Sequence, residues 1–247
     1  MSARQVSESL WQVHAGVFPS NCYLLANADR EALVIDPGLD PDTIIAEVER
    51  LGLRPVGVVC THGHFDHMGS ASVFQKRFGG EVHMHAGDLK TAKAANFLLM
   101  AFKIPAKVAQ PVFTLLRGER GAWRSGGFEV SHRLVPGHSP GSCFITVGDV
   151  CFTGDSLYAT SVGLSKVPGE QPDILRRSLL EVLDEINSDT LICPGHGRTA
   201  KMGDVRLKNR ALAKFLARGE AEIMTKPAHE WEEGEDHLPP RALEVAS

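Results

Sequence analysis

The sequence predicts a mixed α/β fold in which two β-sheets pack together and helices cover their outer faces. Two observations lead to this prediction. Short apolar runs typical of strands occur in both halves of the chain, and amphipathic segments typical of helices lie between some of them. A chain of 247 residues fits one substantial domain, or one domain with a small appendage.

The expected strands are short runs rich in apolar and β-branched residues. In the first half of the chain they cover residues 22–26, 32–36, 56–61 and 82–85. In the second half they cover residues 128–135, 143–147, 150–153 and 190–193. The chain therefore has enough strands to build two sheets.

Four segments have apolar residues at helical spacing, and we place helices at residues 42–51, 73–78, 173–186 and 205–217. Asp42 and Asp173 are the expected N-caps of the first and third helices, because a short carboxylate side chain accepts hydrogen bonds from free backbone N–H groups. Gly52, Gly79 and Gly219 follow the first, second and fourth segments, where glycine commonly ends a helix.

The composition is that of a globular protein without a strong charge bias. Hydrophobic residues make up 43% and charged residues 23%, and the formal net charge is −4. This charge gives no general electrostatic reason to bind nucleic acid, which needs a basic face that displaces counterions. No apolar run is long enough to span a bilayer, and the N-terminus has no apolar stretch typical of a secretory signal. We therefore expect a small-molecule substrate, with no nucleic-acid or membrane partner, and leave the oligomeric state open.

The cysteines indicate a reducing compartment, and we expect a cytoplasmic protein. None of them forms a C-x-x-C pair, and most lie in apolar segments that resemble strands. Small buried apolar residues are therefore expected, rather than a set of disulfides. The five cysteines are Cys22, Cys60, Cys143, Cys151 and Cys193.

Two segments stand apart from the strand and helix pattern. Residues 94–116 are strongly apolar and are interrupted by Pro105 and Pro111. Two interpretations stay open for them: a helical hairpin that closes part of the core, or an apolar lid beside the functional site. Residues 218–247 form an acidic tail, so residues 1–217 are the expected domain.

The strongest functional signal is T-H-G-H-F-D-H at residues 61–67, directly after an apolar strand. Imidazole nitrogens and carboxylate oxygens are the ligands that borderline divalent metals accept. His62 and His64 are two positions apart where the strand opens into a loop, so both can face one ion. Asp66 and His67 continue around the turn and can face a second ion. Four residues of ligand type at one strand end therefore indicate a metal site.

Three further turns carry the remaining candidate ligands, His138, Asp155 and His196. They lie in P-G-H-S-P-G, G-D and P-G-H-G, each after an apolar strand and each beside glycine or proline. A sharp turn at a strand end holds a side chain in a defined place, as a preorganised site requires. Residues 137–141 also match the G-x-S-x-G turn of serine hydrolases, but a strand rather than a helix is expected after them. We therefore interpret His138 as a metal ligand.

Taken in order, T-H-x-H-x-D-H, P-G-H-S-P-G, G-D and P-G-H-G resemble the signature of the metallo-β-lactamase superfamily, over roughly residues 10–215. The resemblance implies a four-layer αβ/βα sandwich. It also implies one metal held by His62, His64, His138 and Asp155, and a second held by Asp66, His67, His196 and the shared Asp155. Asp36 matches a family position that supports the metal loops from outside the ligand set.

The resemblance further implies the chemistry of the site. Two divalent ions, with zinc expected and iron or manganese as alternatives, lower the pKa of a bridging water to give hydroxide near neutral pH. The same ions polarise the carbonyl or phosphoryl oxygen of the substrate. Asp66 would both ligate a metal and orient the attacking hydroxide, which makes it the expected catalytic residue.

The compact chain and its P-G-H-G ending are most similar to the hydroxyacylglutathione hydrolase (glyoxalase II) branch, which implies hydrolysis of a small ester or thioester. That branch usually has a basic residue directly after the glycine of the loop that follows G-D. Here Leu164 follows Gly163, and Lys166 comes two positions later. Lys166 is the candidate for contacting a substrate carboxylate, with a simple exposed lysine as the alternative.

Two other functions stay open for a chain with this signature. The first is a persulfide dioxygenase with a single iron ion. The second is a member of the fold without catalytic activity, which binds a ligand or a protein partner.

Overall fold

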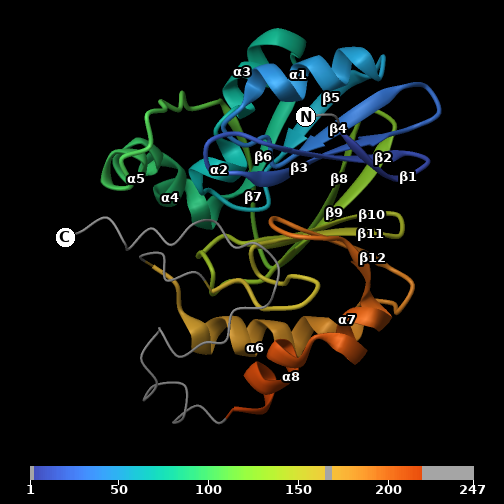
Figure 1. The fold of residues 1–247 in the computed structure, drawn as a ribbon, viewed down its shortest axis with the longest axis vertical. Coiled ribbons are helices and arrows are strands. Elements are labelled where there is room, and N and C mark those ends of the chain that lie inside the picture. Colours follow the sequence, from blue (N-terminus) through green and yellow to red (C-terminus); the bar gives the residue numbers. More distant parts are fainter. Residues whose placement is uncertain (1–2, 165–168, 219–247) are drawn as a thin grey trace.

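The computed structural model describes residues 3–164 and 169–218, and two β-sheets form its centre (Figure 1). The first sheet has seven strands in the order β1-β2-β3-β4-β5-β6-β7. They are β1 (Arg4–Ser7), β2 (Leu10–Ala15), β3 (Ser20–Ala26), β4 (Glu31–Ile35), β5 (Arg54–Val59), β6 (Glu81–His85) and β7 (Phe113–Leu116). Strands β1 to β4 pair antiparallel, whereas β4 to β7 pair parallel.

The second sheet has six strands in the order β13-β12-β11-β10-β9-β8. They are β8 (Arg120–Ser125), β9 (Phe128–Leu134), β10 (Cys143–Val147), β11 (Val150–Gly154), β12 (Leu191–Pro194) and β13 (Ala200–Lys201). Strands β11 and β12 pair parallel, and the other neighbours pair antiparallel.

Helices cover the outer face of each sheet, so the molecule has four layers (Figure 1). On the side of the first sheet they are α1 (Pro41–Arg50), α2 (Phe65–Met68), α3 (Ala71–Phe78), α4 (Leu89–Lys93) and α5 (Ala95–Ala101). On the side of the second sheet they are α6 (Pro172–Val182), α7 (Met202–Lys208) and α8 (Arg210–Ala217). This arrangement confirms the four-layer sandwich that the sequence motifs imply.

The alternation of side chains along the strands explains the layers, because successive residues of a strand point to opposite faces of the sheet. In β4, Val34 packs with Phe74 in the cluster beneath the helices, whereas Leu33 belongs to the cluster between the sheets. In β11, Cys151 packs with the apolar face of α6, whereas Phe152 packs between the sheets. Each sheet is therefore apolar on both faces.

Strand direction brings the loops of the candidate site to one edge of the sandwich. The loops that follow β4, β5 and β6 leave the same edge of the first sheet, and those after β11 and β12 leave one edge of the second. The loop that enters β10 lies at that edge too, since β10 runs antiparallel to β11. Hydrogen bonds join the two edges: Cys143 N donates to Thr61 O at 2.9 Å, and Asn21 N donates to Gly195 O at 2.7 Å.

Two predicted N-caps are wrong, and proline is the reason in both. Asp40, not Asp42, caps α1, where its Oδ1 accepts a hydrogen bond from Thr43 N at 3.0 Å. Gln171, not Asp173, occupies the N-cap position of α6. In each case a proline lies between the two residues and takes the first helical position, for which its fixed φ angle is suited.

The predicted helix at 205–217 is divided in two. Asn209 has a non-helical ψ angle of 86° and separates α7 from α8. Its side-chain oxygen accepts a hydrogen bond from Leu212 N at 2.8 Å, and its amide nitrogen donates to the carbonyls of Tyr158 and Ser161. The polar side chain therefore ends one helix and caps the next.

The helical hairpin proposed for residues 94–116 is wrong in its second half. Only α5 is helical there, and after Pro105 and Pro111 the chain forms β7, which pairs parallel with β6. The prediction also omitted strands β1, β2, β7, β8 and β13. The alternative interpretation, an apolar lid beside the site, stays a prediction. One apolar side chain of this segment, Phe97 on α5, is 65% exposed.

All five cysteines are free and buried, as expected. Burial raises the pKa of the Cys151 thiol to about 12, so this group stays protonated and unreactive at neutral pH. Within residues 3–164 and 169–218, no helix is long and apolar enough to cross a membrane. The predicted acidic tail lies, except for Arg218, outside the described residues.

Replacing Phe152 tests the contact between the sheets. Its side chain is 0% exposed, and its ring lies 5.3 Å from the ring of Tyr23 on the other sheet. Phe152→Ala is expected to lower the free energy of unfolding by about 3–5 kcal/mol, because it removes buried apolar surface and leaves a cavity. Urea unfolding measures the change. Leu207→Ala, at a side chain that is 80% exposed, is the control, and an equal loss in the two variants would contradict the assignment.

Candidate metal centre

The seven candidate ligands lie together at the edge where the two sheets meet. The loop between β5 and α2, together with α2 itself, supplies four of them, and three loops of the second sheet supply the others. All seven side chains are buried: His62, His64, Asp66, His67, His138, Asp155 and His196. The structure therefore brings together every residue that the motifs singled out as a ligand.

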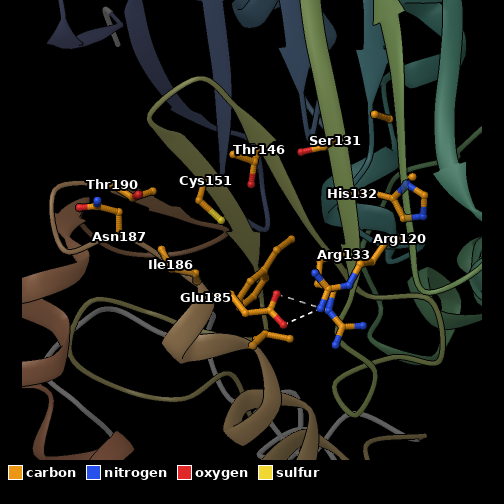
Figure 2. A pocket seen from close by; sticks show the side chains of 14 residues that line it. Arg120, Ser131, His132, Arg133, Thr146, Cys151, Glu185, Ile186, Asn187 and Thr190 are labelled. Atoms are coloured by element: carbon orange, nitrogen blue, oxygen red, sulfur yellow. Dashed lines mark hydrogen bonds and ion pairs between the residues drawn. The ribbon is translucent and has the colours of Figure 1, made fainter.

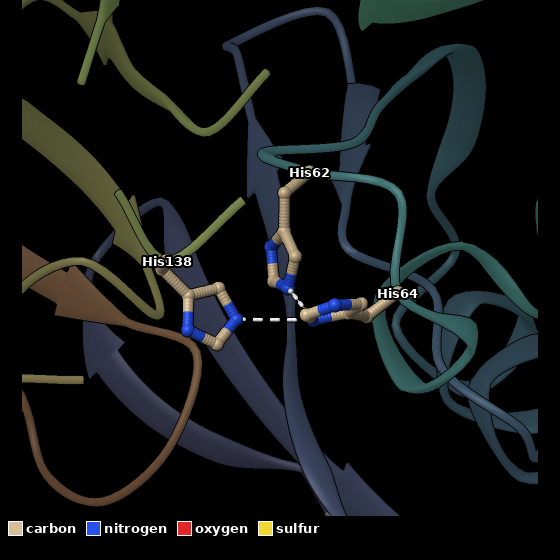
Figure 3. Close-up of side chains that lie close together, drawn as sticks. All are labelled: His62, His64 and His138. Atoms are coloured by element: carbon tan, nitrogen blue, oxygen red, sulfur yellow. Dashed lines mark hydrogen bonds between the residues drawn. The ribbon is translucent and has the colours of Figure 1, made fainter. Parts of the chain in front are cut away.

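Three histidines form the first group of this centre, and their rings converge (Figure 3). His64 Nδ1 lies 3.0 Å from His62 Nε2 and 3.0 Å from His138 Nε2. Two of these rings come from the first sheet's loop, and His138 comes from the loop that enters β10. Three imidazole nitrogens facing one point can coordinate one divalent ion.

Two carboxylates and two histidines form the second group, which consists of Asp66, His67, Asp155 and His196. His67 Nε2 lies 3.3 Å from Asp66 Oδ2 and 3.4 Å from Asp155 Oδ1. His196 Nε2 lies 3.4 Å from Asp66 Oδ2 and 3.4 Å from Asp155 Oδ2. Mixed nitrogen and oxygen ligands of this kind suit zinc, iron or manganese.

Asp155 lies between the two groups. Besides its contacts to His67 and His196, its Oδ2 is 3.7 Å from Nε2 of His138 in the first group. The two rings of His62 and His67, one from each group, have centroids 4.1 Å apart. The groups are therefore neighbours, and Asp155 is placed to serve both.

Unpartnered polar atoms show that the second group fits a cation. His67 Nε2, His196 Nε2 and Asp155 Oδ1 are buried and have no hydrogen-bond partner. A buried polar atom without a partner costs free energy, so three of them facing one another favour a shared cation. A divalent ion satisfies both nitrogen lone pairs and the carboxylate together, which is why these residues fit a metal.

Burial keeps two rings of the first group neutral. It also lowers the pKa of the third ring, His138, but Glu170 and Asp155 outweigh burial there and raise that pKa. Burial, and then the charges of neighbouring histidines, lower the pKa of His64 to about 4 and lower the pKa of His62 well below its ordinary value. Both rings are therefore uncharged at pH 7, and a neutral imidazole is the form that binds a metal.

Charge has the opposite effect in the second group. Burial lowers the pKa of His67 and His196, but the carboxylates of Asp155 and Asp66 outweigh it and raise the pKa of His196 to about 9 and the pKa of His67 well above its ordinary value. Burial raises the pKa of Asp155, but the charges of His196 and His67 outweigh it and hold this pKa well below its usual range. Without an ion, this group therefore contains protonated rings that balance ionised carboxylates.

Asp36 orients His67, at the supporting position that the resemblance implied. It follows β4 with a positive φ angle of 51°, a region that aspartate tolerates better than most residues. Asp36 Oδ1 accepts a hydrogen bond from Thr61 N at 2.7 Å, and Oδ2 lies 2.7 Å from Thr61 Oγ1 and 3.0 Å from His67 Nδ1. A carboxylate on the far nitrogen of a ligand histidine fixes the ring and its tautomer.

The contacts that orient His138 and His196 were not found from the sequence. His138 Nδ1 lies 3.0 Å from Gly163 O and 3.2 Å from Glu170 Oε1. His196 Nδ1 lies 3.1 Å from Pro19 O. Every residue has a backbone carbonyl, so the sequence does not show which carbonyls accept these hydrogen bonds. Glu170 belongs to no strand end or motif. Lys166, the predicted substrate contact, lies outside the described residues.

Polar side chains of β3 hold the turn that carries His196. Asn21 Nδ2 donates hydrogen bonds to Pro194 O at 3.0 Å and Gly197 O at 2.9 Å. Tyr23 OH donates to Pro194 O at 2.8 Å. Both side chains are buried, so the first sheet positions a ligand that the second sheet carries. A buried asparagine within an apolar strand was the available signal, and the sequence analysis missed it.

The histidines of β6 belong to neither group. His83 stacks on Trp123 with ring centroids 4.7 Å apart, and His85 Nε2 lies 3.2 Å from Gly118 O. Neither residue joins a metal-binding group within the described part of the chain. Both are buried, packed residues of the strand rather than candidate ligands.

A cavity of about 630 Å³ lies apart from the ligand groups (Figure 2). Phe144, Cys151 and Arg133 are among the residues that line it, and none of the seven candidate ligands does. Figure 2 shows Arg133 beside Glu185, with Nε and Oε2 3.9 Å apart. Glu119 and Glu181 lie within 3.7 Å of the same guanidinium, so carboxylates of the protein already balance its charge.

Comparison with known proteins agrees with this geometry. The family model described as "Metallo-beta-lactamase superfamily" matches residues 15–196. The probable metallo-hydrolase YqgX of Bacillus subtilis is 29% identical over 188 residues, which cover 74% of this chain and 87% of that protein. The hydroxyacylglutathione hydrolase GloC of Haemophilus influenzae is 28% identical over 195 residues, which cover 78% of this chain and 92% of that protein.

Two solved structures have the same fold. The B3 metallo-β-lactamase BLEG-1 matches with a TM-score of 0.73 and 29% identity, covering 82% of this chain and 99% of that chain. TTHA1623 in a di-iron-bound form matches with a TM-score of 0.71 and 30% identity, covering 81% of this chain and 98% of that chain.

Metal uptake is expected to release protons. At pH 7 the rings of His67 and His196 are protonated in the metal-free protein, because their pKa values are raised, that of His196 to about 9. A ligating imidazole is neutral, so filling the second group expels about two protons per chain, and the affinity for metal rises with pH through the pKa of His196, which is about 9. Zn²⁺ titration calorimetry in buffers of different ionisation enthalpy counts the protons. Uptake of metal at pH 7 without proton release would contradict the charge state described here.

Proposed function

Because the chain belongs to the metallo-β-lactamase superfamily, we propose that it is a binuclear metal-dependent hydrolase that cleaves a small ester or thioester. The observation that carries the proposal is the group of seven buried candidate ligands, in which Asp155 lies close to both groups. Zinc is the proposed metal, with iron or manganese as alternatives, since affinity order alone does not choose among them. The predictions of a small-molecule substrate and a cytoplasmic location belong to the same proposal.

Different side chains of the site have different proposed roles in hydrolysis. When bound, two divalent cations supply a hydroxide nucleophile near neutral pH and polarise the carbonyl of the substrate. His62, His64 and His138 would hold one ion, and His67 and His196 would hold the other together with the two aspartates. Asp66 is the proposed catalytic residue.

The charge of Asp66 suits that role. Burial raises its pKa, but the charges of His67 and His196 outweigh burial and hold the pKa well below its usual range. The carboxylate is therefore ionised at pH 7, and it can accept a hydrogen bond from the attacking water. Such a contact orients the lone pair of the water towards the substrate carbonyl.

The choice of an ester or thioester rests on similarity and on the apolar surroundings. One relative bears the name of a hydroxyacylglutathione hydrolase, and thioester cleavage is the activity that this name describes. Phe65, between two ligands, packs against Phe18 and Phe102, with ring centroids 5.3 Å and 6.1 Å away. These rings connect the metal loop to α5, whose exposed side chains Phe97 and Met100 offer apolar surface for an acyl part of the substrate.

Substrate turnover tests the proposal. Protein loaded with Zn²⁺, Fe²⁺ or Mn²⁺ is assayed against small esters, thioesters, lactones and phosphodiesters. Hydrolysis of an ester or thioester is expected, and Asp66→Asn is expected to lower kcat by about 10²–10⁴-fold, the usual contribution of proton-transfer and positioning groups. Asp204→Asn, which changes an exposed carboxylate on α7, is the control and should retain full activity.

Other outcomes would identify the alternatives. One iron per chain and oxygen consumption with a persulfide would establish a dioxygenase instead. Fully metal-loaded protein with no turnover of any substrate class would indicate a binding protein without catalytic activity.

Metal content separates the roles of two ligands. His64→Ala removes a ligand of the first group alone and is expected to leave about one ion per chain, whereas Asp155→Ala removes the shared carboxylate and should leave less than one. Both variants should lose activity. Elemental analysis of freshly purified protein measures the content, and two ions per chain in both variants would refute the assignment.

A further inference from the structure

A buried carboxylate that is not a candidate ligand joins the two loops of the first metal group. Asp88 is 0% exposed. Its Oδ2 accepts hydrogen bonds from Gly63 N at 2.7 Å and from Ser139 Oγ at 2.6 Å, and its Oδ1 accepts one from Gly141 N at 2.6 Å. Gly63 lies between two ligands of the group, and Ser139 follows the third.

Close packing supports the hydrogen bonds. A Cβ atom on Gly63 would lie 2.8 Å from the backbone oxygen of Asp88, and one on Gly141 would lie 2.5 Å from its backbone nitrogen. Real Cβ atoms do not approach so closely, so both loops need glycine where they meet Asp88. This contact explains a glycine in each of the two motifs.

The position of Asp88 in the fold is well defined. It ends the 3₁₀ turn Ala86–Asp88, which follows β6 directly. His85 Nδ1 accepts a hydrogen bond from Gly87 N at 3.1 Å, and α4 begins at the next residue. A strand on one side and a helix on the other therefore hold the carboxylate.

The two loops that Asp88 joins come from different sheets. His62 and His64 follow β5 of the first sheet, whereas His138 precedes β10 of the second. Their distances to one another depend on how the two loops sit at the shared edge. Three short hydrogen bonds to one buried carboxylate fix that arrangement, because charged acceptors form stronger hydrogen bonds than neutral ones.

We propose that Asp88 is a positioning residue, which sets the place of His138 relative to His62 and His64 and thereby determines the affinity of the first group for its metal. It contacts no ion itself. Outer partners of ligands commonly alter metal affinity by about 10–100-fold when they are replaced. The inference rests on metal binding by the first group, but not on the nature of the substrate.

Asp88→Asn tests the proposal with little change of shape. In either orientation, the amide NH₂ of asparagine faces a backbone N–H, that of Gly63 or that of Gly141, and one of these hydrogen bonds is lost. One of the two stepwise dissociation constants for Co²⁺ is expected to increase by about 10–100-fold, which means weaker binding, and the other is expected to stay unchanged. Chelator competition measures both constants, and the visible absorption of bound Co²⁺ reports the altered geometry.

Two further variants make the result decisive. Ser139→Ala removes only the hydroxyl donor and keeps both backbone hydrogen bonds, so it is expected to weaken the same constant by less than 10-fold, though measurably. Asn27→Ala is the control for stability, because Asn27 accepts hydrogen bonds from Asp29 N and Glu31 N at a turn between β3 and β4. It should lower the thermal midpoint and leave both Co²⁺ constants unchanged.

A purely structural role would give a different pattern. The proposal would be overturned if Asp88→Asn folds and has the same two Co²⁺ dissociation constants and the same Co²⁺ spectrum as the wild type. This would hold even if the thermal midpoint of the variant fell. If Asp88→Asn does not fold, Ser139→Ala decides alone, and unchanged constants there would also overturn it. These measurements use no substrate, so they stand whether or not the chain hydrolyses an ester or thioester.

Discussion

Ionised carboxylates inside the protein are the constraint on which the rest of the site depends. Asp66 and Asp155 are buried at the meeting edge of two apolar sheets, where an unpaired charge is costly. Histidines surround them, and their ring nitrogens that face inward lack other partners. Protons on these rings or divalent ions can supply the balancing charge. The site is therefore stable only in states that place positive charge at its centre, which is the electrostatic basis for holding metal there.

The sandwich supplies the rigidity that this arrangement needs. Each candidate ligand lies one to eight residues beyond a strand end, and residues of the strands belong to three apolar clusters. At the edge where the sheets meet, residues of the first sheet and its loops hold candidate ligands that the second sheet carries. Asn21 holds the turn of His196, and Asp88 holds the loop of His138. Ligand geometry is in this sense a property of the docked pair of sheets rather than of either sheet alone.

Much of this could be predicted, and the failures have physical causes. The buried strands and all seven candidate ligands follow from apolar runs that end in ligand-rich turns. Helix starts were misplaced because a proline beside each aspartate decides the first helical position. Strand β8 alternates exposed and half-buried residues at a sheet edge, and β7 follows a segment that contains two prolines, so neither has a strong apolar pattern. Asp88 was missed because acceptors of backbone N–H groups have no motif, although its place after a strand at the ligand edge was visible.

The spread of the ligands along the chain has a consequence for biogenesis. His62 is reached after a quarter of the sequence, but the second group is incomplete until His196 has been made. A growing polypeptide therefore carries exposed histidines long before it can enclose an ion, and any cation captured early would be held by a partial and solvent-accessible set. Enclosure of an ion by the full set of candidate ligands would thus be a late event, which follows the association of the two halves.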